Sequence, residues 1–271
     1  MKIRLNYKQK GRGKTLILLH GNGENNGYFA SQMDYFAKKY RVIALDTRGH
    51  GKSPRGKEPF TIRQFADDLA DFMKEHSIKK ASILGFSDGG NTALCFAAKY
   101  PELVDRLIVA GANLYPSGVK NIALIPIKIW RKFVDLFSKI DWRAKLHSER
   151  LALVTNEPHI SESELEKIHA RTLVLGGTHD IIKTDHTKLI SRCRVHILSG
   201  NSGDVRCKSS KATQVRASLY RFGIWNTICW NNRILHSFTL LHKTFDGICE
   251  ETRFQGFRLV SHSSWCSLSR L

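Results

Sequence analysis

A short apolar run leads directly into a Gly-x-Ser-x-Gly motif in the stretch Ala81-Ser82-Ile83-Leu84-Gly85-Phe86-Ser87-Asp88-Gly89-Gly90. An Ala-rich segment follows from Asn91 to Tyr100, and Pro101 ends it as proline ends a helix. Strand, tight turn and helix in this order are the context in which the motif exposes a nucleophilic serine. We therefore expect Ser87 to be a catalytic nucleophile, and the alternative is a serine with a structural role.

Apolar runs alternate with helix-length segments on both sides of this stretch. Residues 15–19, 41–45, 106–110, 172–175 and 194–198 are typical of buried parallel strands. Residues 28–39 and 61–77 have the apolar spacing of helices. This alternation predicts an α/β fold, in which a mostly parallel sheet carries helices on both faces.

Residues 114–168 interrupt the alternation, because they contain no strand pattern. We expect a small helical cap here, over the carboxyl edge of the sheet, where open α/β sheets place their ligand sites. A pair of ordinary covering helices is the alternative.

An acyl-transfer site needs two N–H groups that hold an oxyanion. The N–H of Asp88 directly follows the nucleophile, and the N–H of Asn22 lies in the loop after the run at 15–19. These two groups are the expected oxyanion hole. We expect His20, which lies in the same loop as Asn22, to support that loop rather than to act in catalysis.

The acid and the base of a catalytic triad are expected after the later strands. Asp180 follows the run at 172–175 on a glycine-rich loop and is the expected acid, with Asp185 as the alternative. The base should lie on the loop after the run at 194–198, but residues 199–204 contain no histidine. We assign no catalytic histidine, because the remaining candidates have no suitable context: His196, His236, His242 and His262.

The net charge of +19 raises the question of nucleic-acid binding. In residues 1–190 the basic residues mostly stand singly and do not alternate with aromatic residues, so we expect no specific nucleic-acid site.

No apolar run reaches about 18 residues and no signal-peptide pattern is present, so we expect no membrane span and a cytoplasmic protein. The six cysteines lack metal-ligand spacing, and we expect free thiols and no metal.

The composition changes near residue 190. Five of the six cysteines and three of the five tryptophans follow it, whereas all six prolines precede it. Apolar runs after it lack turn and cap signals, although natural domains usually agree at all these levels. We expect an α/β core in residues 1–200, with the cap at 114–168, and an aberrant tail in 201–271. A shifted reading frame and a divergent extension are the two explanations.

Over residues 14–200 these motifs resemble the α/β-hydrolase superfamily. The resemblance rests on four features: His20-Gly21, Asp46-x-Arg48-Gly49-x-Gly51-x-Ser53, Gly85-Phe86-Ser87-Asp88-Gly89-Gly90, and Gly176 with Asp180. Three shorter segments are similar to the biphenyl-hydrolase-like (valacyclovir hydrolase) group: Ser87-Asp88-Gly89-Gly90, Ala97-Ala98-Lys99-Tyr100-Pro101 and Gly111-Ala112-Asn113. The resemblance also implies a Gly-x-x-His turn after the last strand and a C-terminal helix, and the sequence shows neither.

The resemblance implies a serine hydrolase that cleaves small carboxylic esters, including amino-acid esters, with amides as a further class. It implies no metal and no organic cofactor. Beside the nucleophile, the Asp88 carboxylate is a candidate partner for a substrate ammonium group. Dehalogenases and epoxide hydrolases of the superfamily are weaker matches, because they have an aspartate where Ser87 stands. The alternative function is a catalytically impaired protein that lacks the triad histidine.

Overall fold

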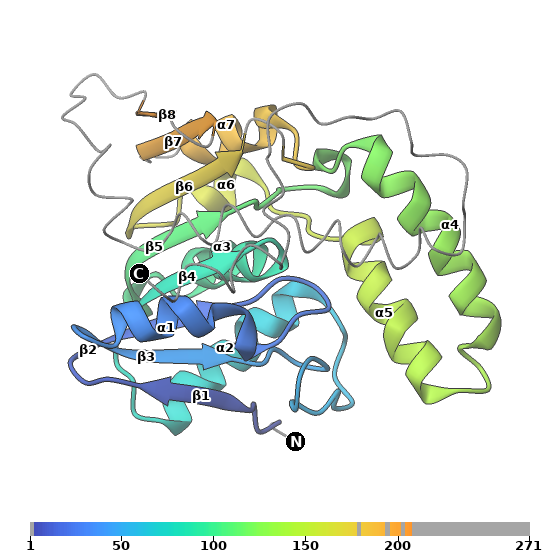
Figure 1. The fold of residues 1–271 in the computed structure, drawn as a ribbon, viewed down its shortest axis with the longest axis horizontal. Coiled ribbons are helices and arrows are strands. Elements are labelled where there is room, and N and C mark those ends of the chain that lie inside the picture. The colour runs from blue at the N-terminus through green and yellow to red at the C-terminus, as the bar shows by residue number, and fades with distance from the viewer. Residues whose placement is uncertain (1–2, 178–179, 193–195, 202–203, 208–271) are drawn as a thin grey trace, which may run out of the picture. The chain divides into compact units, whose positions relative to one another are not determined.

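A mostly parallel sheet forms the centre of the protein in the computed structural model (Figure 1). The structure describes residues 3–177, 180–192, 196–201 and 204–207. Within them the sheet has eight strands in the order β1-β3-β2-β4-β5-β6-β7-β8. The strands are β1 (Tyr7–Lys10), β2 (Lys14–Leu19), β3 (Tyr40–Leu45), β4 (Ala81–Phe86), β5 (Val104–Ala110), β6 (Arg171–Gly177), β7 (His196–Asn201) and β8 (Asp204–Cys207). Neighbouring strands from β3 to β7 pair in parallel, and each edge strand is antiparallel to its neighbour.

The apolar runs explain the central strands and confirm the predicted α/β fold. Each of the six predicted runs contributes to a strand, and the last four residues of both β2 and β3 are buried. Burial on both faces of the sheet leaves no alternation in these strands, as expected for parallel sheets. By contrast, β1 was not predicted, because all four of its residues are exposed and carry no apolar signal.

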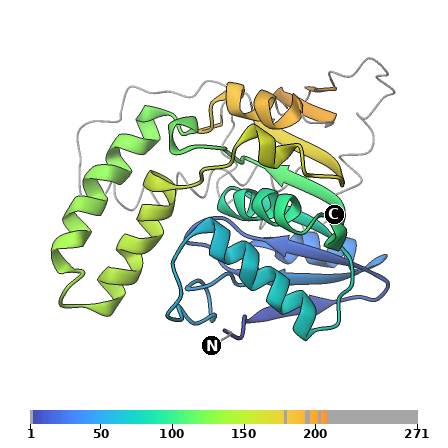
Figure 2. The same cartoon turned by 180° about the vertical axis from the view of Figure 1, so that it is seen from behind.

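Helices cover both faces of the sheet (Figures 1 and 2). The short η1 (Asn26–Phe29) leads into α1 (Ala30–Phe36) on one face. On the other face lie α2 (Ile62–Glu75) and α3 (Asp88–Lys99). After the short η2 (Pro101–Leu103) the chain enters β5, and α7 (Thr184–Arg192) later packs against β6 and β7.

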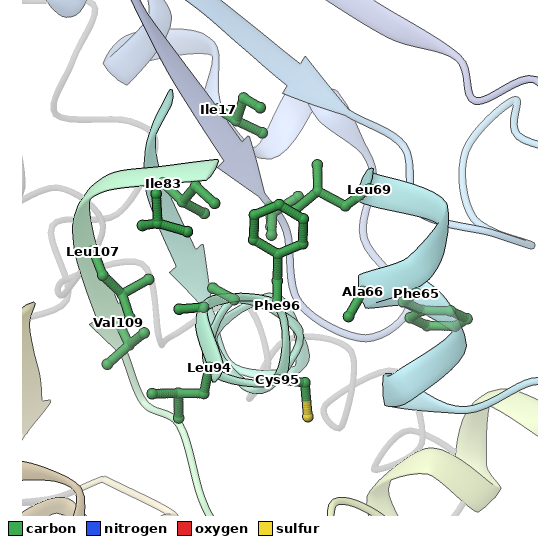
Figure 3. Packing of buried hydrophobic residues seen from close by; sticks show 14 of the residues in the cluster. Ile17, Phe65, Ala66, Leu69, Ile83, Leu94, Cys95, Phe96, Leu107 and Val109 are labelled. Atoms are coloured by element: carbon green, nitrogen blue, oxygen red, sulfur yellow. The ribbon is translucent and has the colours of Figure 1, made fainter. Parts of the chain in front are cut away.

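The core lies where α3 packs between the sheet and α2 (Figure 3). Phe96 and Leu94 of α3 are fully buried. Phe96 lies between Ile83 of β4 and Leu69 of α2, and Leu94 lies beside Val109 of β5. Because α3 begins directly after Ser87, this packing also fixes the position of the first turn of the helix.

The segment between β5 and β6 is helical, as predicted. It contains η3 (Pro116–Gly118), α4 (Asn121–Phe137), α5 (Trp142–Asn156) and α6 (Glu162–Leu165). The helices α4 and α5 form a hairpin on the side to which the carboxyl ends of the parallel strands point (Figure 1). Arg55 ties this hairpin to the core, because its guanidinium donates to both carboxylate oxygens of Glu149, at 2.7 and 3.0 Å.

The sheet continues where the sequence predicted a loop. Residues 199–201 extend β7, and Asp204 begins β8, which pairs antiparallel with β7. The expectation of a catalytic loop at residues 199–204 is therefore wrong, because backbone pairing occupies most of this segment.

Residues 208–271, most of the predicted tail, lie outside the described residues. Among the described helices, none has the length and apolar character needed to cross a membrane.

Candidate active site

Ser87 occupies a strained turn between β4 and α3. Its backbone has φ 53° and ψ −121°, a left-handed conformation that is costly for a residue with a side chain. The Ser87 N–H donates to the carbonyl of Ala110 at 2.8 Å, which holds the turn against the end of β5. The side chain is half-buried at the carboxyl edge of the sheet, in the position that the sequence predicted for a nucleophile.

Three glycines allow this turn to exist. A Cβ atom on Gly85 would overlap the carbonyl of Gly89, and one on Gly89 would overlap the carbonyl of Leu19. The end of β2, the end of β4 and the first turn of α3 can therefore approach one another only without these side chains. Gly21 lies against Ser87 itself, since a Cβ there would stand 3.2 Å from Ser87 Cβ.

The two predicted oxyanion donors lie on the loop and the helix that meet at Ser87. Asp88 is the first residue of α3, so its N–H has no acceptor within the helix. Asn22 directly follows Gly21, which contacts Ser87. In the described part of the chain, no acceptor takes the backbone N–H of either residue. Both groups are thus free for a ligand oxygen.

A network of side-chain amides surrounds the Asp88 carboxylate. Asn22 Nδ2 donates to Asp88 Oδ2 at 2.9 Å, and Asn91 Nδ2 donates to Asp88 Oδ1 at 3.3 Å. Asn91 Nδ2 also reaches Asn113 Oδ1, at 3.1 Å. Burial raises the pKa of the Asp88 carboxyl to about 6, and the two amide donors oppose that rise. The carboxylate therefore holds the loop of Asn22 against α3 and the end of β5.

Asp180 lies two strands away from Ser87 at the same edge. The strand between them, β5, is followed by Gly111, whose N–H donates to the carbonyl of Leu175 of β6 at 3.1 Å. A Cβ on Gly111 would lie 3.5 Å from Asp180 Oδ2 and 3.7 Å from Phe86 Cε2. Two strand spacings amount to about 10 Å between backbones, which leaves room for one imidazole ring between the two side chains.

The surroundings of the two candidate acids differ. Asp180 is buried, accepts the N–H of Ile182 at 3.2 Å, and has its pKa raised by that burial. Asp185 lies on α7 with 87% of its side chain exposed and pairs only loosely with Lys188, at 3.5 Å. The geometry therefore favours Asp180 as the group that orients a base.

His20 and His50 are buried beneath the loop of Asn22. The Thr47 N–H donates to His20 Nε2 at 3.1 Å, so His20 Nδ1 carries the proton and donates to the Gly21 carbonyl at 2.7 Å. Burial lowers the pKa of His20 to about 4 and that of His50 to about 3, so both rings are neutral. His20 thus supports the loop, as expected from the sequence.

The loop after β3 also supports the candidate site, although the sequence alone suggested no role for it. The Asp46 carboxylate accepts the N–H groups of Asn26 and Lys52, at 2.6 and 2.9 Å. Arg48 is fully buried and makes two bonds to the Asp68 carboxylate, at 2.6 and 2.7 Å. The spacing Asp46-x-Arg48 was visible in the sequence, but its partner Asp68 on α2 was not.

The base that a catalytic triad would need is not found among the residues that the structure describes. Among the described residues, no histidine ring is hydrogen-bonded to the Ser87 hydroxyl or to the Asp180 carboxylate. For His196 only the backbone is described, within β7. The other candidates from the sequence, His236, His242 and His262, lie outside the described residues.

Comparison with known proteins agrees with the observed fold. The alpha/beta hydrolase fold family matches residues 14–141. The human serine hydrolase BPHL is 40% identical over 221 residues, which cover 72% of this chain and 75% of the human protein. The chain belongs to the α/β-hydrolase superfamily. Within it, the chain is similar to the BPHL group, since mouse serine hydrolase BPHL is also 31% identical over 199 residues, 66% of this chain and 67% of the mouse protein.

Solved structures support the same fold. MGS-M2, an α/β-hydrolase enzyme from a Medee basin deep-sea metagenome library, superposes with a TM-score of 0.63 at 19% identity and covers 82% of this chain and 95% of its own. At that identity the likeness concerns the fold alone. The curated homologues are hydrolases, which supports a hydrolase activity for this chain.

Proposed function

We propose that this chain is a serine hydrolase that cleaves carboxylic esters, with amides as a further class, through an acyl-enzyme on Ser87. The observation that carries the proposal is the backbone of Ser87, whose φ of 53° persists only where the surrounding fold enforces it. Strain of this kind concentrates at functional sites, and we infer that here it exposes the hydroxyl at the edge of the sheet where the N–H groups of Asn22 and Asp88 lie.

The proposed reaction uses the residues in separate roles. Ser87 Oγ attacks the ester carbonyl carbon while its proton passes to an imidazole nitrogen, and the carbonyl electrons move onto oxygen. The N–H groups of Asn22 and Asp88 donate to that oxyanion. Collapse of the intermediate expels the alcohol, which takes up the proton, and water then releases the acid by the same steps. Asp180 orients the imidazole and stabilises its charged form.

A catalytically impaired protein is the second candidate. It is favoured by one observation, namely that no histidine in the described part of the chain is bonded to Ser87 or Asp180. Without a base, a triad loses several orders of magnitude in rate and keeps only what binding and the oxyanion hole provide.

Labelling with a fluorophosphonate distinguishes the two candidates. The full-length chain and Ser87→Ala are incubated with the probe, and the modified residue is located by mass spectrometry. The proposed enzyme labels stoichiometrically and rapidly at Ser87, and it hydrolyses a p-nitrophenyl ester at a rate that the variant lacks. Labelling of Ser87 no faster than that of the surface residue Ser163 would instead identify the impaired protein.

A further inference from the structure

Exposed apolar side chains gather on one part of the molecule. In the described part of the chain, eight of the ten large apolar side chains that are exposed lie within residues 122–142. The other two, Tyr7 and Tyr35, are each 36% exposed and stand apart from that region. Single exposed apolar residues are normal on soluble proteins, whereas a contiguous group marks an interaction surface.

The group forms a stripe along α4. Its members recur at spacings of three and four residues, which places them on one side of the helix, and between 51% and 75% of each side chain is exposed: Ile122, Ile125, Ile129, Phe133 and Leu136. The opposite side of α4 is already buried in the hairpin through Leu124, Ile127 and Val134. The helix is therefore apolar on two faces, and only one of them has a partner within the described residues.

The end of the hairpin continues this surface. Ile140 is 84% exposed and Trp142 is 69% exposed. Beside them, Phe133, Phe137 and Ala144 line a hollow of about 390 Å³ between α4 and α5. The apolar surface thus runs the length of α4 and round the turn into α5.

Basic residues border the apolar stripe. Lys128 and Lys132 each precede a stripe residue by one position, so they lie about 100° to one side of the stripe, and both are exposed. Lys139 is exposed in the turn of the hairpin. Residues 120–145 contain seven Lys or Arg and two Asp or Glu, a net charge of +5.

We propose that the outward face of α4, defined by the stripe residues and the bordering lysines, docks on the surface of an anionic lipid bilayer. An apolar face with basic side chains along its border is the pattern of helices that lie in the membrane interface. The apolar residues enter the acyl boundary, and the lysines meet the anionic head groups. The proposal is independent of the activity of Ser87.

The charge distribution favours lipid over two other occupants. A second copy of this chain would bring the same exposed lysines, Lys128 and Lys132, against one another, and two like-charged faces repel. Residues 208–271 of the same chain carry nine Lys or Arg and three Asp or Glu, so they too are basic and do not complement this face. An anionic lipid bilayer supplies both an acyl region for the apolar stripe residues and negative charge for the bordering lysines.

Vesicle cosedimentation of the full-length chain tests the proposal. We expect binding to phosphatidylcholine vesicles that contain about one third phosphatidylserine, little binding to phosphatidylcholine alone, and weaker binding as salt is added. Lys128→Gln with Lys132→Gln should lower the partition coefficient about 30-fold, because each lost charge near the surface costs about a factor of five. Ile125→Ser with Ile129→Ser should lower it by about 100-fold or more.

Matched variants keep the test specific. Lys79→Gln with Lys80→Gln removes two exposed charges elsewhere, and Tyr35→Ser removes an exposed ring, so both should bind like the wild type. All the substituted side chains are exposed, and circular dichroism should report an unchanged fold. Equal binding to neutral and anionic vesicles, or equal loss in the Lys79/Lys80 variant, would overturn the proposal. A dimer that Ile125→Ser with Ile129→Ser dissociates, without vesicle binding, would assign the face to a second copy instead.

Discussion

The side chain of Asn22 donates from Nδ2 to Oδ2 of Asp88 at 2.9 Å and so joins the two residues whose backbone N–H groups form the candidate oxyanion hole. The same amide donates to the Arg150 carbonyl at 2.6 Å, which links the hole to α5 of the cap. The position of the Asn22 N–H therefore depends on the Asp88 side chain and on α5.

Asn22→Ala should slow fluorophosphonate labelling of Ser87 by about 10- to 100-fold, because the N–H remains but its loop is no longer fixed. Asn25→Ala is the matched control, since Asn25 lies in the same loop and caps only the N–H of Gly27, at 2.8 Å. The labelling rates of both variants are measured on aliquots in which the reaction is stopped at successive times. An unchanged rate in Asn22→Ala would show that the side-chain bond does not position the donor.

Asp88→Asn tests whether the carboxylate recognises a substrate ammonium group. An asparagine cannot accept from both Asn22 and Asn91 without placing its own NH₂ against one of those donors, so rates on all esters should fall. The informative quantity is the ratio of kcat/KM for an amino-acid ester to that for its uncharged analogue. We expect this ratio to fall about tenfold or more on loss of the charge. A constant ratio would limit Asp88 to its structural bonds.

Asp180→Asn should lower kcat by about 10⁴-fold, because a neutral amide neither orients an imidazole in the required tautomer nor stabilises its charge. Asp185→Asn is the control, since 87% of that side chain is exposed and the change should leave kcat within a factor of two or so. Ester hydrolysis at saturating substrate measures both. A large loss of kcat in Asp185→Asn but not in Asp180→Asn would instead identify Asp185 as the acid.

The features that could be predicted from the sequence are those that have a recognisable pattern in one short stretch of the chain. The tight turn at Ser87 was visible because its glycines and its flanking strand and helix are contiguous in the chain. Asn22 and Asp180 could be proposed as site residues because parallel strands bring their carboxyl ends to one edge, so a position directly after a strand was enough to nominate them. The strand β1 gave no signal, since an exposed edge strand has no buried face.

Other features depended on contacts that local sequence does not encode. The amide network around Asp88 joins residues from three separate segments, and the ion pair of Arg48 reaches a helix 20 residues away. The expected loop at 199–204 was wrong because a polar, glycine-containing segment fits a strand pair as well as a loop. The absence of a histidine from that segment, by contrast, was evident from the sequence.

Asp68→Ala should destabilise the fold by about 3–5 kcal/mol, because it leaves the guanidinium of Arg48 buried without its partner. The control is Glu149→Ala, whose pair with Arg55 is partly exposed, at 29% for Arg55 and 23% for Glu149, and whose loss should cost about 1 kcal/mol or less. Urea unfolding at neutral pH gives both free energies. Similar losses in the two variants would mean that the loop of Arg48 rearranges to reach water.

As the pH falls, Asp88 and two buried histidines change the free energy of unfolding in opposite directions. The pKa values of His20 and His50 fall on folding from 6.5 to about 4 and about 3, so the stability they contribute is present above pH 6.5 and lost as the pH falls. The pKa of Asp88 instead rises from 3.8 to about 6, so its contribution is present below about pH 4 and lost as the pH rises through 6.

Between pH 4 and about 6 the two effects therefore have opposite signs. Each titrating group changes the free energy of unfolding by about 1.4 kcal/mol per pH unit, so the two histidines together outweigh Asp88 and stability falls on acidification. Asp88→Asn removes the opposing contribution, and its free energy of unfolding should fall more steeply than that of the wild type, by about 1.4 kcal/mol per pH unit. Urea unfolding at a series of pH values measures the difference, with Asp185→Asn as the exposed control. Parallel curves for wild type and Asp88→Asn would mean that water reaches the Asp88 carboxylate in the folded protein and that its charge is not buried.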